Sequence, residues 1–598
     1  MAIVKLEKVS IVGQVTRKQS VLKALQQFGE LHIIDLKGAS KDTALSDKLS
    51  DELKKALRYL ESSPVKRKQA PYTEELNIEE IIIKTRCNEQ RKREYSDKYD
   101  ALLQREATLS PWGDFELPRL EDIAGNSLWF YILPRKYLKC LLDLTYPWEI
   151  VHQNHSHAWV VLIGQIEPPA DILPVERFHT GKYSLSAITE QRIRAELDLE
   201  DIEVERQQLT RYIHVMKRKR ARAIDQTNLG IAIASSVDLE KLFIVQAWVA
   251  KNSLAKLGAL AERYEIAVYA EPVSEEDDPP TLLSNPDKVK GGEALVNFYQ
   301  TPAYTAWDPS FILFVSFSLF FAMILSDAAY SAILLSGLLA SWFKLGKTET
   351  GKNLRPLLGS ICLTSLVWGM LVGSYFGKAP GEESLFGVIH ILDVNDFDTM
   401  MMLSIACGLL HIMLANLQQV FLYWGSAKSL LHTGWVLVLV AGAIVGLTFE
   451  NHPELVNYGY AFGVCGLVLV FVAGGQRKIH TGIDVVIRIL EGFKSLTAIT
   501  NIFGDVLSYL RLFALGLASA SLALTFNDLA SHAFASESGL GVLFGLLILI
   551  VGHTLNLFLA IVSGVVHGLR LNFIEFYKWA LDGEGHPFKA FKKREYSQ

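Results

Sequence analysis

The sequence predicts an α+β cytosolic half followed by an all-α membrane domain of eight transmembrane helices. Half of the 598 residues are hydrophobic while 21% are charged, and the mean hydropathy is +0.21. A chain that is both apolar and charged is best explained by two unlike parts. Charged residues are scattered over the first 290 or so residues and become rare past Phe311. Positive charge also follows every second apolar segment.

The composition excludes several classes of protein. A net charge of −5 and a pI near 6.3 give no support to nucleic-acid binding. The start, MAIVKLEKVSIVG, lacks the apolar core of a signal peptide. The five cysteines are odd in number and far apart, so they indicate neither a disulfide framework nor a zinc site. They are Cys87, Cys140, Cys362, Cys407 and Cys465.

An acidic, proline-rich segment at residues 271–293 separates the two parts and is typical of a linker. We therefore expect a cytosolic part at residues 1–295 and a membrane domain at residues 296–598. Strands and helices alternate before the linker: IVKLEKVSIVG, RKQSVLKALQQFGE and LHIIDL; then SLWFYILP, RKYLKCLLDL and HAWVVLIGQI; then LFIVQAWVA, SLAKLGALAERY and IAVYAEP. Such β-α-β pieces predict ferredoxin-like lobes.

Charged helical stretches lie between these pieces, at residues 42–61, 78–109 and 188–224. The last one carries a narrow apolar stripe of Ile193, Leu197, Ile202, Leu209, Ile213 and Met216. A stripe of this kind among charges predicts an antiparallel coiled-coil hairpin that joins the lobes. The basic run at residues 217–222 is either a solvated face of the coil, which we favour, or a phosphate-binding patch.

Eight apolar segments are long enough to cross a bilayer. They cover residues 311–325, 328–343, 354–376, 400–423, 430–449, 456–473, 497–529 and 540–579. The first two are short, and one long tilted helix is the rival interpretation. Lysines and arginines follow the second, fourth, sixth and eighth segments, whereas the other loops are acidic or neutral. This alternation favours eight spans over seven, with both termini in the cytoplasm.

Two arginines lie inside the last two apolar segments, where a charge is costly and usually functional. Arg511 lies roughly 15 residues into its expected helix, and Arg570 is near the cytoplasmic end. A polar stripe also runs along one face of the eighth segment, formed by His553, Asn556, Ser563, His567 and Arg570. It indicates an ion path, and hydrogen bonding between helices is the alternative.

The segment GKTETGKN, residues 346–353, resembles a phosphate-binding loop. Such a loop needs a preceding strand and a hydroxyl after its lysine. Here an apolar helix precedes it and Asn353 follows the lysine. We therefore expect no nucleotide site there, and no cofactor or metal elsewhere in the chain.

The segments SYLRLFALGLA and GLRLNFIEFYKWALDGEGHPFKAF resemble the membrane stator subunit of V-type and archaeal A-type rotary ATPases, called subunit a or subunit I. The likeness extends to QAWVA, PPTLLSNP, YQTPAYTAWDPSFI, LVWGMLVGSYFG and GHTLN, and the compact loops are similar to the prokaryotic branch. It implies a non-catalytic, ion-translocating subunit of a plasma-membrane ATPase or ATP synthase. The implied partners are a rotor ring whose subunits bear a carboxylate, the peripheral stalks and the cap of the central stalk.

The resemblance implies that Arg511 and Arg570 face the rotor ring. Candidate half-channel residues are Asp327, His411, Gln418, Glu491, Asp505, His553, Asn556, Ser563, His567 and Glu575. The chain departs from the eukaryotic pattern at two places, because Ser519 replaces a histidine and Ala560 replaces a glutamate. The order of polar residues along the half-channels is therefore not copied from that branch.

Two other functions remain open from the residues. A secondary ion-coupled transporter with a cytosolic regulatory domain would explain the arginines, but it would be favoured by an inverted repeat, which the membrane part does not present. A membrane-tethered scaffold without transport is the third possibility. Copurification of a small ring-forming membrane protein would favour the stator over both.

Overall fold

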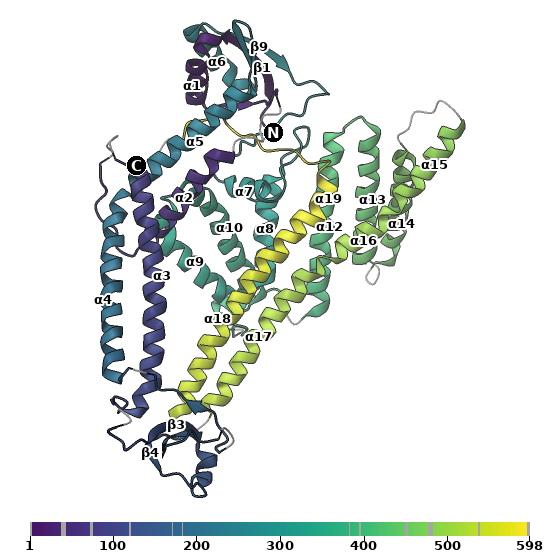
Figure 1. Cartoon of the computed structure of the whole chain (residues 1–598). Coiled ribbons are helices and arrows are strands. Elements are labelled where there is room, and N and C mark those ends of the chain that lie inside the picture. Colours follow the sequence, from purple (N-terminus) through teal and green to yellow (C-terminus); the bar gives the residue numbers. More distant parts are fainter. Residues whose placement is uncertain are drawn as a thin grey trace. The chain divides into compact units, whose positions relative to one another are not determined.

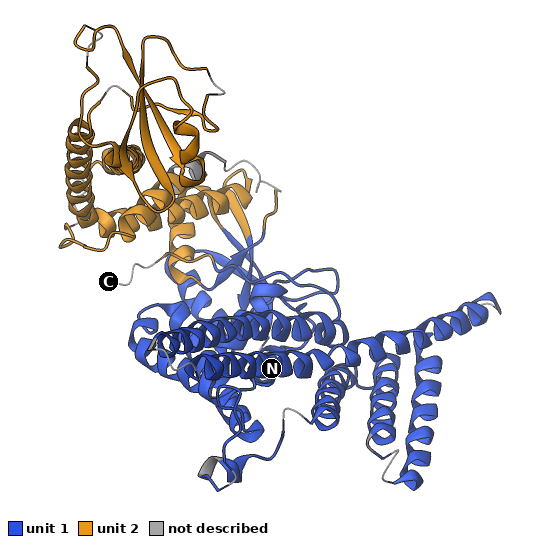
Figure 2. Ribbon diagram, turned by 90° about the horizontal axis from the view of Figure 1, so that it is seen from below, with its two compact units in different colours: residues 1–12, 30–34, 246–590 blue, residues 13–29, 35–245, 591–598 orange. Residues whose placement is uncertain are grey.

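The computed structural model describes residues 3–37, 44–71, 76–118, 121–169, 172–181, 183–381, 383–393, 396–448, 452–475, 482–535 and 539–594. Its contacts divide the chain into two compact units (Figure 2). The first unit comprises residues 1–12, 30–34 and 246–590, and the second comprises residues 13–29, 35–245 and 591–598. The N-terminal part mixes strands with helices, and the C-terminal part is helical (Figure 1).

The first sheet has the strand order β2-β8-β1-β9, with β7 paired to β8. Its strands are β1 (Leu6–Gln14), β2 (Leu31–Ile33), β7 (Val237–Leu239), β8 (Leu242–Ala250) and β9 (Ala267–Pro272). Helix α1 (Lys18–Phe28) connects β1 to β2, and α6 (Leu254–Tyr264) connects β8 to β9. Leu6, Val9 and Ile11 are buried along β1, because alternate side chains of a strand share one face.

The C-terminal tail binds this sheet within the first unit. The backbone N–H of Lys589 donates to His32 Nδ1 over 2.9 Å, and the N–H of Thr281 donates to the carbonyl of His586 over 2.8 Å. Burial, together with the nearby His586 and Lys589, lowers the pKa of His32 to about 4. His32 is therefore neutral at pH 7, and its ring nitrogen can accept the bond from the tail.

The second sheet has the order β4-β5-β3-β6 and is antiparallel throughout. Its strands are β3 (Ser127–Pro134), β4 (Trp148–Gln153), β5 (His157–Gly164) and β6 (Arg177–Phe178). The segment RKYLKCLLDL, expected to be a helix, forms only a 3-10 turn at Arg135–Leu141. The segment Trp148–Gln153 pairs with β5 as an additional strand, and Pro147 just before it leaves little room for a longer helix.

Four helices separate the two sheets in the sequence: α2 (Ala44–Glu61), α3 (Ile78–Leu109), α4 (Leu185–Leu209) and α5 (Ile213–Ser235). Helices α3 and α4 lie antiparallel, since Glu106 pairs with Arg192 over 2.6 Å while Asn88 bonds to Glu205 over 2.8 Å. The apolar stripe is only half buried, because Ile193 and Leu197 are 45% and 56% exposed. Residues 42 and 43 of the expected helical stretch lie outside the described residues.

Helices make up the C-terminal part. They are α7 (Lys290–Tyr299), α8 (Ser310–Leu325), α9 (Ala328–Leu345), α10 (Glu349–Val372), α11 (Leu385–Ile389), α12 (Phe397–Leu422), α13 (Ala427–Thr448), α14 (Pro453–Gly474), α15 (Gly482–Leu496), α16 (Ala498–Leu507), α17 (Leu510–Phe534), α18 (Gly539–Arg570) and α19 (Tyr577–Ala580). Within the described residues, seven helices, with α15–α17 taken as one and α18–α19 as another, are long and apolar enough to cross a membrane. Helix α8 is apolar too but has only 16 residues.

A sharp break separates α8 from α9, where one long helix was the rival interpretation. Ser326 has a φ of 44°, in the left-handed region, and ends α8. The Asp327 carboxylate then caps α9 by accepting the N–H of Tyr330 over 3.0 Å. Gly369 packs closely against this break, because a Cβ there would lie 2.3 Å from the Ala328 nitrogen.

Candidate functional site

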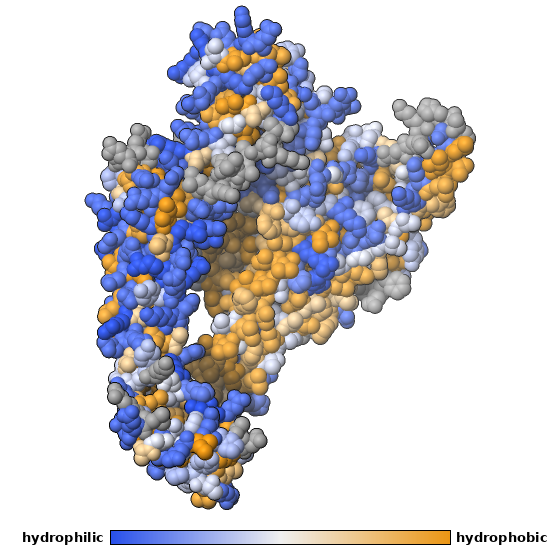
Figure 3. Space-filling view, viewed as in Figure 1, coloured by the Kyte–Doolittle hydropathy of each residue, from blue (hydrophilic) through white to orange (hydrophobic). Residues whose placement is uncertain are grey.

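Helices α17 and α18 lie side by side and run antiparallel (Figure 1). A Cβ on Gly545 or Gly552 would meet the ring of Phe534 or Phe526, so two glycines of α18 make room for aromatic side chains of α17. The outward surface of the two helices is apolar (Figure 3). One of the two polar clusters described next lies where α17 begins and α18 ends, and the other lies within the two helices.

Arg511 and Arg570 meet a single buried carboxylate. Arg511 Nη1 and Arg570 Nε each lie 3.8 Å from Glu575 Oε1. The hydroxyl of Ser508 donates to the same oxygen over 2.6 Å, and Arg511 Nη2 donates to that hydroxyl over 3.1 Å. The Glu575 side chain is 4% exposed, compared with 22% for Arg511 and 51% for Arg570. We call Ser508, Arg511, Arg570 and Glu575 the arginine cluster.

The arginine cluster has spare hydrogen-bonding capacity. Glu575 Oε2 and Arg511 Nη1 are both buried and have no hydrogen-bond partner among the described residues. Two cations share one anion, so the cluster carries a formal charge of +1. An additional carboxylate at this place would find both an unpaired donor and an excess positive charge.

The structure corrects the expected depth of Arg511. A break at Ser508 and Tyr509 divides the expected long helix into α16 and α17, and Arg511 is the second residue of α17. The turn tightens there, with Arg511 N bonded to Ser508 O and Leu512 N to Tyr509 O. A cation at a helix N-terminus is disfavoured by the helix dipole, so the charge of Glu575 offsets this cost.

His411 lies next to the arginine cluster, on α12. Its Nδ1 is 2.8 Å from the hydroxyl of Tyr509, and its ring stacks on Phe576 at 4.2 Å. Gly408, one turn before His411, makes room for Tyr509, because a Cβ there would lie 2.6 Å from the tyrosine ring. The His411 ring therefore packs against Tyr509 and Phe576. In the chain, Tyr509 stands two residues before Arg511, and Phe576 directly follows Glu575.

A second polar cluster lies farther along α18. His553 Nδ1 is 2.7 Å from the Tyr330 hydroxyl, and His553 Nε2 is 3.1 Å from Asn527 Oδ1. The amide of Asn556 donates to Tyr330 over 3.1 Å and to the carbonyl of Ser519 over 2.9 Å. We call these five residues the Tyr330 cluster. Asn556 and Arg570 are 14 positions apart, or about 21 Å along a helix.

Asp327 lies beside the Tyr330 cluster, but both oxygens of its carboxylate already accept hydrogen bonds. Besides capping α9, its carboxylate accepts bonds from Ser374 Oγ over 2.8 Å and from Gly377 N over 3.0 Å. These bonds join the break between α8 and α9 to the segment after α10. The geometry therefore favours a structural role for Asp327.

The remaining candidates are placed apart from the two clusters or make few polar contacts. Asp505 binds Lys578 over 2.9 Å and Trp579 Nε1 over 2.7 Å, joining α16 to α19. His567 is one turn before Arg570, and its buried Nδ1 has no hydrogen-bond partner in the described part of the chain. Glu491 lies on α15, next to α14, while Gln418 and Ser563 are half-buried on α12 and α18.

Several polar residues escaped the sequence analysis. Tyr330, Asn527 and Tyr509 complete the hydrogen bonds of two candidate histidines. Gln419, rather than its neighbour Gln418, is buried and bonds to the carbonyl of Ala580. A period of three or four from His411 would have reached Gln419 as readily as Gln418, but the other three have no such signal in the sequence.

Between Arg511 and Leu529, which is 50% exposed, one face of α17 carries short side chains. Ala514, Ala518, Ser521 and Thr525 are exposed and follow Arg511 at helical spacing. Exposed positions of α18 instead carry large side chains such as Val551, Phe558 and Val562. This face of α17 is therefore smooth, whereas the exposed surface of the neighbouring helix α18 is rougher.

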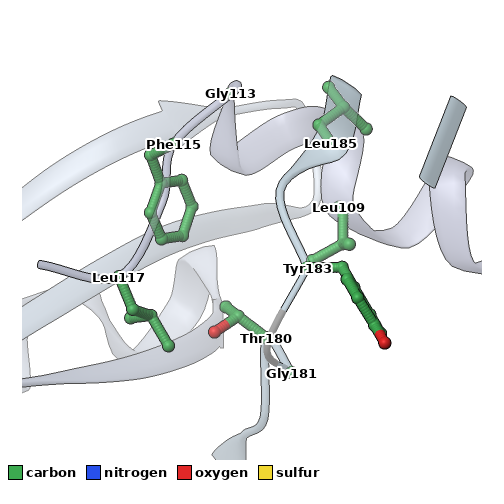
Figure 4. Close-up of a pocket in the computed structure, with 8 residues that line it drawn as sticks. All are labelled: Leu109, Gly113, Phe115, Leu117, Thr180, Gly181, Tyr183 and Leu185. Atoms are coloured by element: carbon green, nitrogen blue, oxygen red, sulfur yellow. The ribbon is translucent and has the colours of Figure 1, made fainter. Parts of the chain in front are cut away.

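A small pocket lies in the second unit, outside the apolar helices. It is lined by Leu109, Gly113, Phe115, Leu117, Thr180, Gly181, Tyr183 and Leu185 (Figure 4). Its free volume is about 10 Å³, roughly the room that one water molecule needs. The pocket is too small for a substrate.

No protein-family model matches the chain. The chain is 27% identical over 636 residues to a V-type ATP synthase subunit I of Borreliella burgdorferi, with 99% of each chain covered. It is 26% identical to an A-type ATP synthase subunit I of Methanocaldococcus jannaschii, over 71% of this chain and 67% of the relative. With a V-type subunit I of Chlamydia pneumoniae it shares 29% identity, over 59% of this chain and 61% of the relative.

Among solved structures, the cytoplasmic N-terminal domain of a subunit I aligns with 44% of this chain at 16% identity. Its TM-score of 0.25 is too low to support a fold assignment. The sequence relatives and the seven apolar helices together indicate an integral membrane protein. Along almost the whole of both chains, this protein is therefore similar to subunit I of a V-type ATP synthase.

Proposed function

We propose that this chain is the membrane stator of a rotary ATPase, in which the arginine cluster faces the rotor ring. One observation carries the proposal. In a chain whose relatives are named subunit I, two arginines from adjacent membrane helices converge on one buried carboxylate. A cluster with this much charge inside apolar helices is costly and is expected to be functional.

The mechanism follows from charge. A rotor carboxylate can face lipid only when a proton or sodium ion neutralises it, because a bare charge there is too costly. Beside Arg511, which stays protonated, the ionised form of that carboxylate is favoured. The bound ion is then released on one side and taken up on the other, and each charge that crosses gains roughly 2.3 kcal/mol per 100 mV.

Two separate polar clusters suit two offset half-channels. The Tyr330 cluster, with His553 and Asn556, would line one half-channel. His411, Asp505, His567 and Glu575 surround the arginines and would line the other. Gln418, Glu491 and Ser563 remain candidates, and Asp327 would support the first path by fixing the turn beside it. The apolar surface between the clusters would prevent a direct leak.

We further propose eight spans, counting the short helix α8, with both termini in the cytoplasm and the domain boundary near residue 295. The β2-β8-β1-β9 order with two connecting helices supports a ferredoxin-like first lobe. The α3–α4 pair would be the arm that binds the peripheral stalks and the cap of the central stalk. We propose no nucleotide site, because residues 346–348 form the connection between α9 and α10 and residues 349–353 are the start of α10.

Crosslinking tests the proposed partner. A cysteine at Ala518, on the smooth face of α17, is expected to crosslink to a small, very hydrophobic subunit that copurifies with the complex in the membrane. A matched cysteine at Val464 on α14, which is 62% exposed, should give no such product. Crosslinking from Val464 but not from Ala518 would place the ring on another face and contradict the proposal.

Cysteine labelling tests the topology. In a variant without native cysteines, we expect cysteines at Glu383 and Ala535 to react with an impermeant reagent from outside the cell. A cysteine at Lys347, in the turn between α9 and α10, should react only after the membrane is opened. All three positions are exposed in the structure, so accessibility alone does not distinguish them. Labelling of all three from the same side would rule out the eight-span arrangement.

A further inference from the structure

The turn between α9 and α10 gathers positive charge at the end of two apolar helices. Lys344 lies in the last turn of α9, Lys347 lies in the connection, and Lys352 and Arg355 lie in the first two turns of α10. Glu349 is the one acidic residue between Lys344 and Arg355. Within the described part of the chain, no carboxylate lies within salt-bridge distance of the four cations.

Arg355 is held in one place without an acidic partner. Its guanidinium carbon lies 5.0 Å from the centre of the Trp342 ring, a cation–π distance. On another side it lies against Gly346, where a Cβ would come within 1.2 Å of Nη2. Its Nε is buried and has no hydrogen-bond partner among the described residues. Leaving a buried charged donor unpaired is costly, so the arrangement calls for an acceptor.

We infer that the phosphate group of an anionic phospholipid binds at this turn. A fixed guanidinium offers a planar fork of N–H donors that matches phosphate oxygens, and the three lysines add charge around it. Trp342 is suited to the level of the lipid headgroups. Leu339 and Phe343, one turn or less away, are 59% and 83% exposed and would contact the acyl chains.

A bound lipid accounts for both the cations of the turn and the exposed apolar residues beside them, whereas free phosphate accounts only for the cations. The cations continue directly into the lipid-facing side of α9, so headgroup and acyl chains would be bound by one continuous surface. Clusters of basic residues beside a membrane helix attract anionic lipids. The lipid would fix the connection between α9 and α10 at the membrane surface.

Native mass spectrometry of the full chain tests the inference. The protein is released from phosphatidylcholine nanodiscs that contain a minor fraction of phosphatidylglycerol, and the retained lipids are counted. The wild type is expected to retain phosphatidylglycerol in preference to phosphatidylcholine. Arg355→Gln should retain about tenfold less, since a charge-assisted hydrogen bond is worth roughly 1.5–3 kcal/mol and each 1.4 kcal/mol is tenfold.

Two further variants separate position from charge. Gly346→Ala keeps all four cations, and the φ of −73° at Gly346 suits alanine, but the new methyl group would displace the guanidinium. It should lose phosphatidylglycerol nearly as Arg355→Gln does. Lys428→Gln removes a cation elsewhere, which already lies 4.7 Å from the ring centre of Tyr423 and 4.0 Å from Asp582, and should retain the lipid.

The outcomes that would overturn the inference are distinct. Equal retention by wild type and Arg355→Gln, or unchanged retention by Gly346→Ala, would show that the fixed guanidinium binds no lipid. Loss of phosphatidylglycerol in Lys428→Gln would mean that the lipid is held only by general attraction to positive charge. Displacement of the lipid by an excess of inorganic phosphate would show that the site takes free phosphate instead. Thermal unfolding of each variant checks that the fold is intact.

Discussion

Arg511→Ala is expected to abolish ion transport and coupled ATP turnover while leaving the complex assembled. Arg511 is the less exposed of the two arginines, and its buried Nη1 has no hydrogen-bond partner among the described residues. In the proposed mechanism it keeps the rotor carboxylate ionised, and without it nothing favours release of the bound ion. The measurement is ATP-driven pumping and ion-driven ATP synthesis in reconstituted vesicles.

Two companion variants sharpen this result. Arg511→Lys should remain impaired, because a buried ammonium can lose its proton and lacks the fork of the guanidinium. Arg570→Ala should be milder, since its side chain is 51% exposed and water can replace part of its role. Near-normal coupling in Arg511→Ala, with normal assembly, would mean that another residue couples the ion to rotation.

Glu575→Gln is expected to have the second largest effect. The amide oxygen can still accept the bond from Ser508, but the negative charge between the two arginines is lost. Their mutual repulsion then rises, and both side chains should move away from the positions that face the ring. A cost of about 1.4 kcal/mol would slow coupled transport roughly tenfold.

The slower transport in Glu575→Gln should be accompanied by a shift in the positions of the Arg511 and Arg570 side chains. In a variant that carries a cysteine at Ala514, crosslinking of this cysteine to the ring should change when Glu575 is replaced. ATP hydrolysis by the soluble part of the complex, detached from the membrane, should stay normal. Glu454→Gln is the matched control, because Glu454 is exposed in the first turn of α14, away from the arginine cluster, and should leave transport unchanged. Equal losses in both variants would indicate a general effect of acidic residues and contradict the specific role.

The sequence predicted the mixed N-terminal part and the helical C-terminal part, and it singled out the two arginines that lie near Glu575 in the structure. Their signals are local: alternation, helical periodicity and charge within apolar runs. It did not predict that Glu575 lies between the arginines, because the pairing with Ser508 spans 67 positions and depends on how α16, α17 and the end of α18 pack. For the same reason Tyr330 and Asn527 went unnoticed as partners of His553.

Local signals also misjudged two elements. The break before Arg511 has no glycine or proline, so hydrophobicity alone read α16 and α17 as continuous. The break instead accompanies the Ser508–Glu575 hydrogen bond, which is a tertiary contact. In the second sheet, the segment after β3 has apolar residues at helical spacing, yet the pairing of β4 with β5 decides the outcome and leaves only a short turn.

The short side chains along α17 have a consequence for motion. In the proposed mechanism, a ring that turns past Ala514, Ala518, Ser521 and Thr525 would meet only short side chains on this stretch, which ends before the exposed Leu529. Interlocking side chains would have to separate and repack at every step, and each step would carry an activation barrier of its own. If the ring slides along this smooth face as proposed, friction would stay low, and the charges at Arg511 and its neighbours would mainly shape the energy landscape of rotation.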